Sequence, residues 1–395
     1  MQFRRSALAR CIGDPEEFAS ESWGHSPVIR RGADSFDDLL DIDVVERLLT
    51  GPARRPLVRL VRGGSPVPVG EYSATLRLGG VLVDDMVDVA RVMRLVAEGA
   101  TVVLQSLQHS WPPIARFCNE LQCEVGHVVQ ANCYLTPPAS TALARHRDAH
   151  EVLVLQIAGS KVWTIEHIGE VVLQPGDVMY LPRGTWHEAA SHDQLSLHLT
   201  IGILAVTART ALQRAIDRLP AGQLDRALPL GFSVRSDRAE LARAQLAQAL
   251  HSVERDVDVD AAIAKEVERI MSMQRVLPSG HLRAVLRDTP IDVSTWLQVD
   301  PRLVTRVEGD QLVLRAGDRE LWVPGYVTSA IDALRGAATA RVGSLPDLDA
   351  KSQVVLARRL VLESLAYVVA PVDRVRSRMF DTAWNGEACD HDQPQ

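Results

Sequence analysis

Up to about residue 205, this 395-residue chain consists of short apolar runs separated by Gly, Pro and Asp, a pattern that limits the folds it can adopt. The runs are rich in β-branched side chains. Such runs, bounded by turn residues, predict strands of a β-sandwich or barrel. We expect these strands at residues 101–105, 128–135, 152–157, 161–165, 178–181 and 195–203. Helices are expected before or between them, at 41–49, 87–98 and 113–122.

The next stretch, from 206 to 277, has a helical pattern. It is rich in Ala and Leu, and its segments 238–253 and 261–271 contain neither Gly nor Pro, which favours helices. A helical segment between two domains usually packs against a neighbouring domain or a second copy of the chain. We therefore expect residues 206–277 to form a helical linker or dimerisation domain.

The remainder mixes helices and strands. Helices are expected at 280–286, 326–334 and 349–367, a strand at 302–307, and a hairpin from 311 to 323. A few helices with one β-hairpin are typical of a winged-helix-like domain, which we place at 278–384. The polar segment 385–395 predicts a frayed tail.

The composition excludes several classes of protein. With 46% hydrophobic and 24% charged residues, the chain is not collagen, a long coiled coil or wholly disordered. Its net charge of −7 argues against a protein that coats nucleic acid. No run approaches the ~20 apolar residues of a membrane span, and no secretory signal is expected. Five scattered cysteines without C-x-x-C spacing indicate free thiols in a reducing cytoplasm.

The residues that carry chemistry lie between 132 and 198. His146 and Asp148 form an H-x-D pair, and alternation along a strand would put both on one face. His187 follows a P-G-D turn, a strand and a Pro-Arg-Gly loop, which can bring it to a neighbouring strand. Two imidazoles and one carboxylate are the ligands of a facial triad that leaves positions of Fe(II) open. Each motif alone is weak, because an isolated H-x-D or strand histidine is common on surfaces and in cores.

Lys161 strengthens this interpretation. It begins an apolar strand after Ala158-Gly159-Ser160, and a buried cation requires a partner of opposite charge. The distal carboxylate of a dicarboxylate cosubstrate would provide that partner.

These segments together resemble the JmjC-type ribosomal oxygenases. The resemblance is carried by 131–138 (ANCYLTPP), the H-x-D pair, 155–163 (LQIAGSKVW), 175–187 (PGDVMYLPRGTWH) and 197–200 (LHLT). It extends to 22–27 (SWGHSP) near the N-terminus, and after residue 205 it is architectural only. The family consists of cupin-fold protein hydroxylases that depend on Fe(II) and 2-oxoglutarate. The resemblance thus implies an α+β fold with a double-stranded β-helix (JmjC/cupin jelly roll) over residues 1–205.

The resemblance also implies roles for single residues. His146, Asp148 and His187 would bind the metal. Lys161 would pair with the distal carboxylate of 2-oxoglutarate, and Tyr134 would donate a hydrogen bond to it. Two further residues would lie beside the site: Asn132, near iron or substrate, and His198, whose role stays open.

The chain departs from the family at the mouth of the site. Arg147 and Ala149 replace an aromatic and an acidic residue, and His150 replaces an aliphatic one. His150 lies farther along the strand and is not expected to be a fourth ligand. The substrate could therefore differ from the ribosomal proteins of the family.

Three functions remain open at this point. The helical segment and winged-helix-like end favour a hydroxylase of a protein side chain, with a ribosomal protein among the candidate substrates. The altered mouth fits a hydroxylase of a free or carrier-bound amino acid or natural product. A non-catalytic cupin that binds or regulates is the third option, against which the complete triad argues. No dense stripe of Arg or Lys appears, so we expect protein contacts and not nucleic-acid binding.

Overall fold

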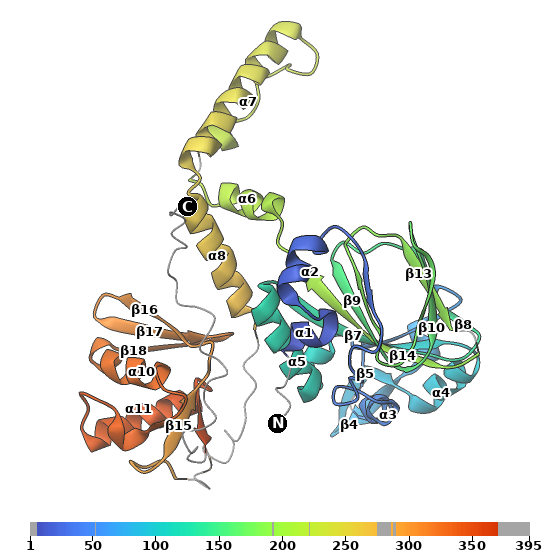
Figure 1. The fold of residues 1–395 in the computed structure, drawn as a ribbon. Coiled ribbons are helices and arrows are strands. Elements are labelled where there is room, and N and C mark those ends of the chain that lie inside the picture. The colour runs from blue at the N-terminus through green and yellow to red at the C-terminus, as the bar shows by residue number, and fades with distance from the viewer. Residues whose placement is uncertain are drawn as a thin grey trace, which may run out of the picture. The chain divides into compact units, whose positions relative to one another are not determined.

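The structure is a computed structural model that describes residues 6–51, 53–191, 193–220, 222–274, 286 and 290–369 (Figure 1). The chain divides into two compact units, Met1–Ile270 and Met271–Gln395, which are described separately below. The segment 206–277, expected as a separate helical domain, falls almost wholly within the first unit. Of the expected helix at 280–286 only residue 286 is described, and the tail at 385–395 lies outside the described residues.

Two antiparallel sheets form the body of the first unit. The larger sheet has the order β1 (Val28–Arg30), β12 (Val178–Leu181), β9 (Glu151–Gly159), β14 (Ser196–Leu204), β7 (Val128–Thr136), β6 (Thr101–Leu104), β2 (Val58–Arg62) and β3 (Ser65–Pro66). The smaller sheet has the order β11 (Gly169–Leu173), β10 (Lys161–Ile165), β13 (His187–Ser191) and β8 (Ser140–His146). The non-sequential order is that of a jelly roll, so the predicted α+β cupin architecture is confirmed at this level.

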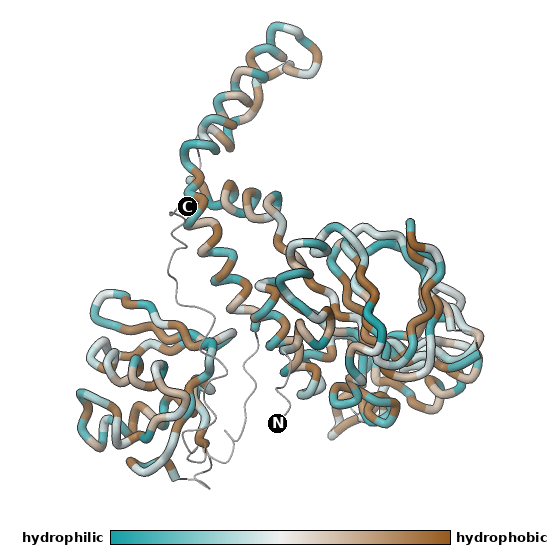
Figure 2. Tube along the Cα trace, in the orientation of Figure 1, coloured by the Kyte–Doolittle hydropathy of each residue, from teal (hydrophilic) through white to brown (hydrophobic). Residues whose placement is uncertain are grey.

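The hydrophobic pattern explains why the two sheets stack. Along β9, Val152 and Val154 contribute to a core between the sheets that also contains Trp163 of β10. The alternate residues Leu153 and Leu155 face the main core on the other side. Because successive side chains of a strand point to opposite faces, a strand that is apolar at every position is buried on both. Figure 2 shows the resulting apolar strands in the barrel.

Helices cover the outer face of the larger sheet. They are α1 (Ala7–Ile12), α2 (Pro15–Glu21), α3 (Ile42–Thr50), α4 (Val89–Ala97) and α5 (Pro112–Val125). Figure 1 shows α1, α2 and α5 on the side of the barrel away from β8, β10 and β13. The smaller sheet therefore stays uncovered by these helices. The expected helices at 41–49, 87–98 and 113–122 correspond to α3, α4 and α5.

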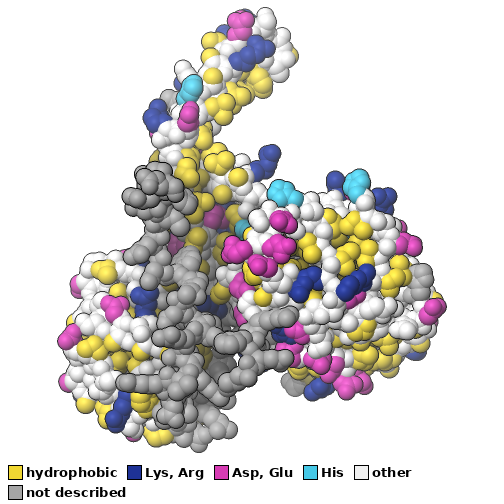
Figure 3. Space-filling model, viewed as in Figure 1, with side chains coloured by type: hydrophobic (Ala, Val, Ile, Leu, Met, Phe, Trp, Pro, Cys, Tyr) yellow, Lys and Arg dark blue, Asp and Glu magenta, His cyan; other side chains and the backbone are white. Residues whose placement is uncertain are grey.

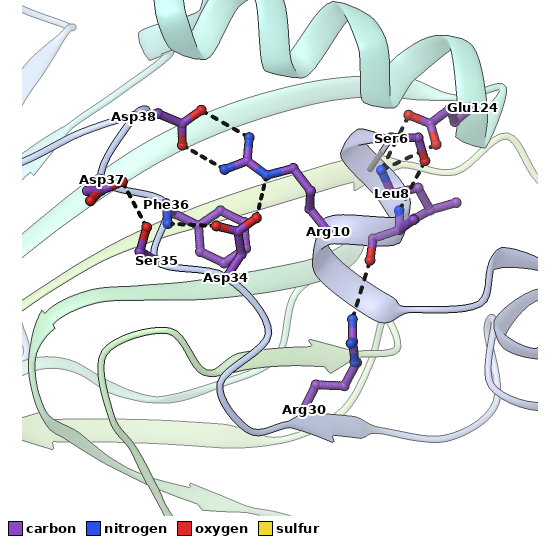
Figure 4. Close-up of polar contacts among 11 residues, drawn as sticks. Ser6, Leu8, Arg10, Arg30, Asp34, Ser35, Phe36, Asp37, Asp38 and Glu124 are labelled. Carbon is purple, nitrogen blue, oxygen red and sulfur yellow. Dashed lines mark hydrogen bonds and ion pairs between the residues drawn. The ribbon is translucent and has the colours of Figure 1, made fainter. Parts of the chain in front are cut away.

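The buried side chain of Arg10 connects α1 to neighbouring elements of this helical layer (Figure 4). The Arg10 guanidinium donates to Asp34 Oδ2 at 2.8 Å and to Asp38 Oδ1 at 2.6 Å. It also lies over the rings of Phe36, 5.2 Å from the centroid, and Phe117, 5.7 Å away. Since Phe117 belongs to α5, one side chain connects α1, α5 and the loop after β1.

A β-hairpin and three helices complete the described part of the first unit. The hairpin pairs β4 (Ser73–Leu78) with β5 (Val81–Val87). The helices are α6 (Ala208–Asp217), α7 (Ser236–Asp256) and α8 (Val259–Ser272). The long helix α7 buries a single residue, Ala242, so most of its surface is exposed. The predicted helices at 238–253 and 261–271 correspond to α7 and α8.

The second unit has its own core beneath two three-stranded sheets. One sheet has the order β19 (Ala340–Arg341), β15 (Trp296–Val299) and β20 (Ala366–Val369). The other comprises β16 (Val304–Glu308), β17 (Gln311–Ala316) and β18 (Arg319–Pro324), and the helices are α10 (Thr328–Arg335) and α11 (Ala350–Leu362). In the described residues, β16 corresponds to the strand expected at 302–307, and β17 and β18 correspond to the expected hairpin. The sheet of β15, β19 and β20 was not expected, and the helix expected at 349–367 ends early. Ser364 has a φ of +61°, which breaks the helix before β20.

No helix in the described part of the chain is both long and apolar enough to cross a membrane.

Candidate metal centre

Three polar side chains converge at one end of the smaller sheet. His146 ends β8 and His187 begins β13, and the two residues are direct partners in the antiparallel register of these strands. Their ring centroids are 4.4 Å apart. Asp148 Oδ2 lies 3.9 Å from His146 Nε2 and 3.5 Å from His187 Nε2. One ligand atom from each residue thus lies within 4.8 Å of the others, a spacing that a single metal ion can bridge.

The backbone determines which imidazole nitrogens face this centre. His146 Nδ1 lies 2.9 Å from the carbonyl of Ala144, and His187 Nδ1 lies 3.0 Å from the carbonyl of Thr185. A carbonyl only accepts, so each Nδ1 carries the proton in the neutral ring. The lone pairs are then on both Nε2 atoms, which face Asp148, as in metal sites whose histidines are oriented by backbone carbonyls. The residues present therefore fit a divalent metal.

The local backbone differs from the expected one in one respect. The strand β8 ends at His146, so Asp148 and His150 lie in the connection to β9 and not on a continuous strand. Asp148 keeps its place because its carbonyl accepts a hydrogen bond from the Gly184 N–H at 2.8 Å. Gly184 has a φ of +84° in the Pro-Arg-Gly loop, a conformation that favours glycine. The loop before His187 thus positions both of these ligands.

A cavity of about 240 Å³ adjoins the triad. It is lined by Arg59, Asn132, Tyr134, Leu143, His146, Asp148, His150, Val152, Lys161, Trp163, His187, Ala189, His198 and Thr200. All seven residues expected to form the site therefore line one space, although they come from β7, β8, β10, β13, β14 and the loop after β8.

Lys161 is the unusual residue of this cavity. It is 1% exposed, and its ammonium donates to Thr136 Oγ1 at 3.0 Å. No carboxylate of the described residues lies within ion-pair distance of it, so the expected anionic partner is not part of the described chain. Burial lowers the pKa of Lys161 to about 7, and the nearby Cys133 thiol opposes this shift. Such a buried and unpaired amine favours binding of an anion.

Tyr134 and His198 form the wall beside Lys161. They are register partners on β7 and β14, and their rings stack with centroids 5.0 Å apart. His198 is 2% exposed and its Nδ1 has no hydrogen-bond partner in the described chain. Burial, and then the charge of Lys161, hold the pKa of His198 well below its ordinary value. A neutral imidazole with one unused nitrogen therefore faces this cavity.

Asn132 lies two residues before Tyr134 on β7. Its Oδ1 accepts a hydrogen bond from the Ser106 N–H at 2.9 Å, so this oxygen anchors the end of β6. The side chain also lines the cavity.

Among the lining residues that were not anticipated from the sequence, Arg59 and Trp163 contact the expected site residues. Arg59 comes from β2, and its buried Nε has no partner in the described chain. It partly offsets the rise that burial causes in the pKa of Tyr134. Trp163 of β10 lies 5.6 Å from His198 and 5.9 Å from His187, between centroids. An arginine inside an otherwise apolar strand such as 58–61 (VRLV) was the signal available for Arg59.

Comparison with known proteins agrees with this geometry. Residues 104–169 and 164–211 match a family model described as the JmjC domain. These residues contain the complete triad, Lys161 and His198. Residues 104–211 are therefore similar to a JmjC domain.

Curated relatives each match part of the chain. The "Bifunctional lysine-specific demethylase and histidyl-hydroxylase NO66" of Branchiostoma floridae is 42% identical over 108 residues, covering 26% of this chain and 18% of that protein. "Ribosomal oxygenase 1" of Rattus norvegicus is 35% identical over 137 residues, covering 28% of this chain and 23% of that protein. The chain spans about a fifth of the length of these relatives.

Among solved structures, the crystal structure of the Escherichia coli ribosomal oxygenase YcfD is similar with a TM-score of 0.49 and 16% identity. The match covers 90% of this chain and 98% of that one.

Proposed function

We propose that this JmjC-domain chain is an Fe(II)- and 2-oxoglutarate-dependent oxygenase that hydroxylates a side chain of a protein substrate. The observation that carries the proposal is that one cavity is lined both by the triad and by the buried Lys161, which has no carboxylate partner in the described chain. One group is suited to a divalent metal and the other to a carboxylate. A small dianion that also chelates a metal, as 2-oxoglutarate does, satisfies both.

The roles of the chain's residues follow from this arrangement. His146, Asp148 and His187 would hold the metal by two Nε2 atoms and one carboxylate, leaving coordination positions open. With its cosubstrate and oxygen, bound iron supplies the oxidant that converts a C–H bond into an alcohol. With two neutral imidazoles and one carboxylate as ligands, Fe(II) would form a centre with a net charge of +1, which suits a dianionic chelator.

The far end of the cavity would hold the distal carboxylate. Lys161 would provide the charge, Tyr134 a hydroxyl donor, and His198 an N–H from its unpaired Nδ1. Charge-assisted hydrogen bonds in a buried site are the stronger kind, and they fix the orientation of the cosubstrate. Asn132, held by Ser106, would face substrate or metal near the centre.

We further propose that a second copy of the chain covers α7 and α8. Leu241, Leu246 and Leu250 of α7 are exposed by 51%, 59% and 64%, and Ile263 of α8 by 55%. Figure 3 shows hydrophobic side chains exposed along α7. An apolar helix surface of this kind is costly in water and is typical of an interface. The second unit would be a winged-helix-like domain that contacts a protein partner, with a ribosomal protein as one candidate substrate.

A reducing cytoplasm suits this chain, because Cys11, Cys118 and Cys133 are buried free thiols.

The experiment loads the chain with Fe(II) without oxygen, adds 2-oxoglutarate and oxygen, and measures succinate. Wild type should form succinate slowly without substrate, whereas Asp148→Ala should form none. Equal succinate from both proteins would refute the assignment of the triad. Candidate protein substrates are then screened for a mass gain of about 16 units, the one oxygen atom that hydroxylation would add.

The residues at the entrance of the site, which differ from the family pattern, support a second candidate function. Arg147, Ala149 and His150 surround the site where the substrate would enter, so a free or carrier-bound amino acid is an alternative substrate. A non-catalytic binding module is the third candidate, and it would bind 2-oxoglutarate without turnover.

A further inference from the structure

A second hollow opens beside the metal-ligand cluster. It has a volume of about 370 Å³ and is lined by Arg147, Asp148, Ala149, Arg183 and Gly184, and we call it the rim hollow. Asp148 lines both the rim hollow and the cavity that contains Lys161. A substrate that reaches the metal ligands therefore passes next to the rim hollow.

The Arg147 guanidinium is held in place without a carboxylate partner. It lies over the Trp186 ring, 5.3 Å from the centroid, and Arg145 lies 5.5 Å from the same centroid. In the part of the chain that the structure describes, neither arginine has a carboxylate within ion-pair distance. A cation–π contact orients a guanidinium but leaves its N–H groups available at the edge.

Arg183 also lines the rim hollow, and its guanidinium is accessible to a ligand. Its side chain is 47% exposed, and its nearest carboxylate is Glu151, whose Oε1 lies 3.8 Å from Arg183 Nε. Glu151 Oε2 already accepts from the Tyr180 hydroxyl at 2.6 Å and from the Arg183 N–H at 3.1 Å. In the described chain the Arg183 guanidinium pairs with Glu151 by charge but donates no hydrogen bond to it, so its N–H groups remain available to a second anion.

We propose that the rim hollow binds a carboxylate side chain of the substrate, so that the enzyme selects a polypeptide segment with Asp or Glu close to the residue it modifies. This inference rests on the proposed function and specifies its substrate class. Two planar guanidinium groups match the oxygens of a carboxylate in pairs of parallel hydrogen bonds. Because the rim hollow and the cavity at the metal ligands share Asp148, the acidic residue lies close in sequence to the modified one. A strongly basic segment would place like charges against Arg147 and Arg183.

The rim hollow suits a polypeptide better than a nucleic acid. Binding a nucleic-acid strand depends on neutralising several phosphates in succession, and two arginines line this hollow. Bases also need an open aromatic face for stacking. The neighbouring Trp186 ring is already in contact with Arg145 and Arg147.

The test measures binding of fluorescein-labelled hexaglutamate, hexalysine and an eight-nucleotide oligouridine by fluorescence anisotropy at low salt. The proteins are the full wild-type chain, Arg147→Gln/Arg183→Gln and a control, Arg238→Gln/Arg255→Gln, which removes two exposed arginines of α7. An Arg147→Lys/Arg183→Lys variant keeps the charge but loses the planar donor pairs. Circular dichroism checks that each variant is folded.

We expect hexaglutamate to bind wild type and the control alike, and to bind Arg147→Gln/Arg183→Gln about tenfold more weakly, with the lysine variant in between. Hexalysine should not bind. Hexaglutamate binding that is absent, or unchanged in the glutamine variant, would overturn the proposal. Tighter binding of oligouridine that is lost in this variant would also overturn it and indicate a nucleic-acid site. The measurement needs no turnover, so its failure is distinguishable from failure to form succinate.

Discussion

The buried ammonium of Lys161 donates to the hydroxyl of Thr136, 3.0 Å away, and this neutral group is its hydrogen-bond partner in the described chain. A hydroxyl satisfies one donor but does not balance a charge. An anion beside Lys161 would balance this charge, in the same cavity that the two imidazoles and the carboxylate of the triad line.

Binding of the cosubstrate should take up a proton above pH 7. Burial lowers the pKa of Lys161 from its ordinary value near 10.4 to about 7, so above pH 7 the amine of the ligand-free chain is mostly neutral. A carboxylate binds the charged form, so the affinity for 2-oxoglutarate should fall as the pH rises from 7 to 9. Calorimetry in two buffers with different protonation enthalpies measures this uptake.

Lys161→Met is the matched test of this pH dependence. It should bind 2-oxoglutarate more weakly at pH 7 and show no proton uptake. Lys265→Met, which changes an exposed lysine of α8, is the control and should behave as wild type. Proton uptake that persists in Lys161→Met would assign the titration to another group.

Metal binding should depend on Asp148 and not on His150. Asp148→Ala removes one of three converging ligands, so Mn(II) affinity should fall by more than the roughly 10- to 100-fold typical of losing an outer partner. His150 Nε2 also lies 3.9 Å from Asp148, but His150 is outside the cluster of three. His150→Ala should therefore keep most of the affinity. Mn(II) titration by electron paramagnetic resonance would show the opposite order if His150 were the ligand.

The chain should dimerise through the exposed leucines of α7. Replacing Leu241, Leu246 and Leu250 by Ser should convert a dimer into a monomer in light scattering, because the apolar area that drives association is lost. The matched control replaces the exposed Leu76, Leu78 and Leu82 of the β4–β5 hairpin by Ser. A wild-type monomer, or a dimer that survives the α7 changes, would contradict this prediction.

Arg10→Met should destabilise the first unit by about 2 kcal/mol, because it leaves Asp34 without its charged partner. Burial alone would raise the pKa of Asp34, but the hydrogen bond and charge of Arg10 lower it below its ordinary value. The stabilisation is therefore present above pH 4, the ordinary carboxyl pKa, and is lost as the pH falls further. Urea unfolding of wild type and Arg10→Met at pH 7 and pH 3 measures this contribution to the free energy of unfolding.

Arg62→Met is the control for Arg10, since the Arg62–Glu98 pair is exposed and should contribute less than about 1 kcal/mol. If both variants lost the same free energy of unfolding, the burial of Arg10 would contribute no additional stability.

Local sequence patterns predicted much of the fold and the site. The strands β10 and β12 match their expected ranges because their apolar runs are short and bounded by turns. The triad and Lys161 could be identified from the H-x-D pair, the order and spacing of the four residues, and the resemblance to a known family. All of them line one cavity in the structure.

Other features depend on contacts that are distant in sequence. Arg59 reaches the cavity because β2 pairs with β6, and β6 with β7, a strand order that no local pattern reveals. The early end of α11 depends on the left-handed backbone of Ser364, which is not a residue type that marks such a turn. The rim hollow likewise forms where the loop after β8 meets the Pro-Arg-Gly loop.

Calorimetric titration of 2-oxoglutarate into the Mn(II)-loaded chain without oxygen tests the central claim most directly. We predict binding to wild type that disappears when the metal is removed by a chelator, and that is strongly weakened in Asp148→Ala and Lys161→Met. Mn(II)-loaded wild type that binds no 2-oxoglutarate, or binds it equally well in both variants, would contradict the assignment of this cavity to metal and cosubstrate.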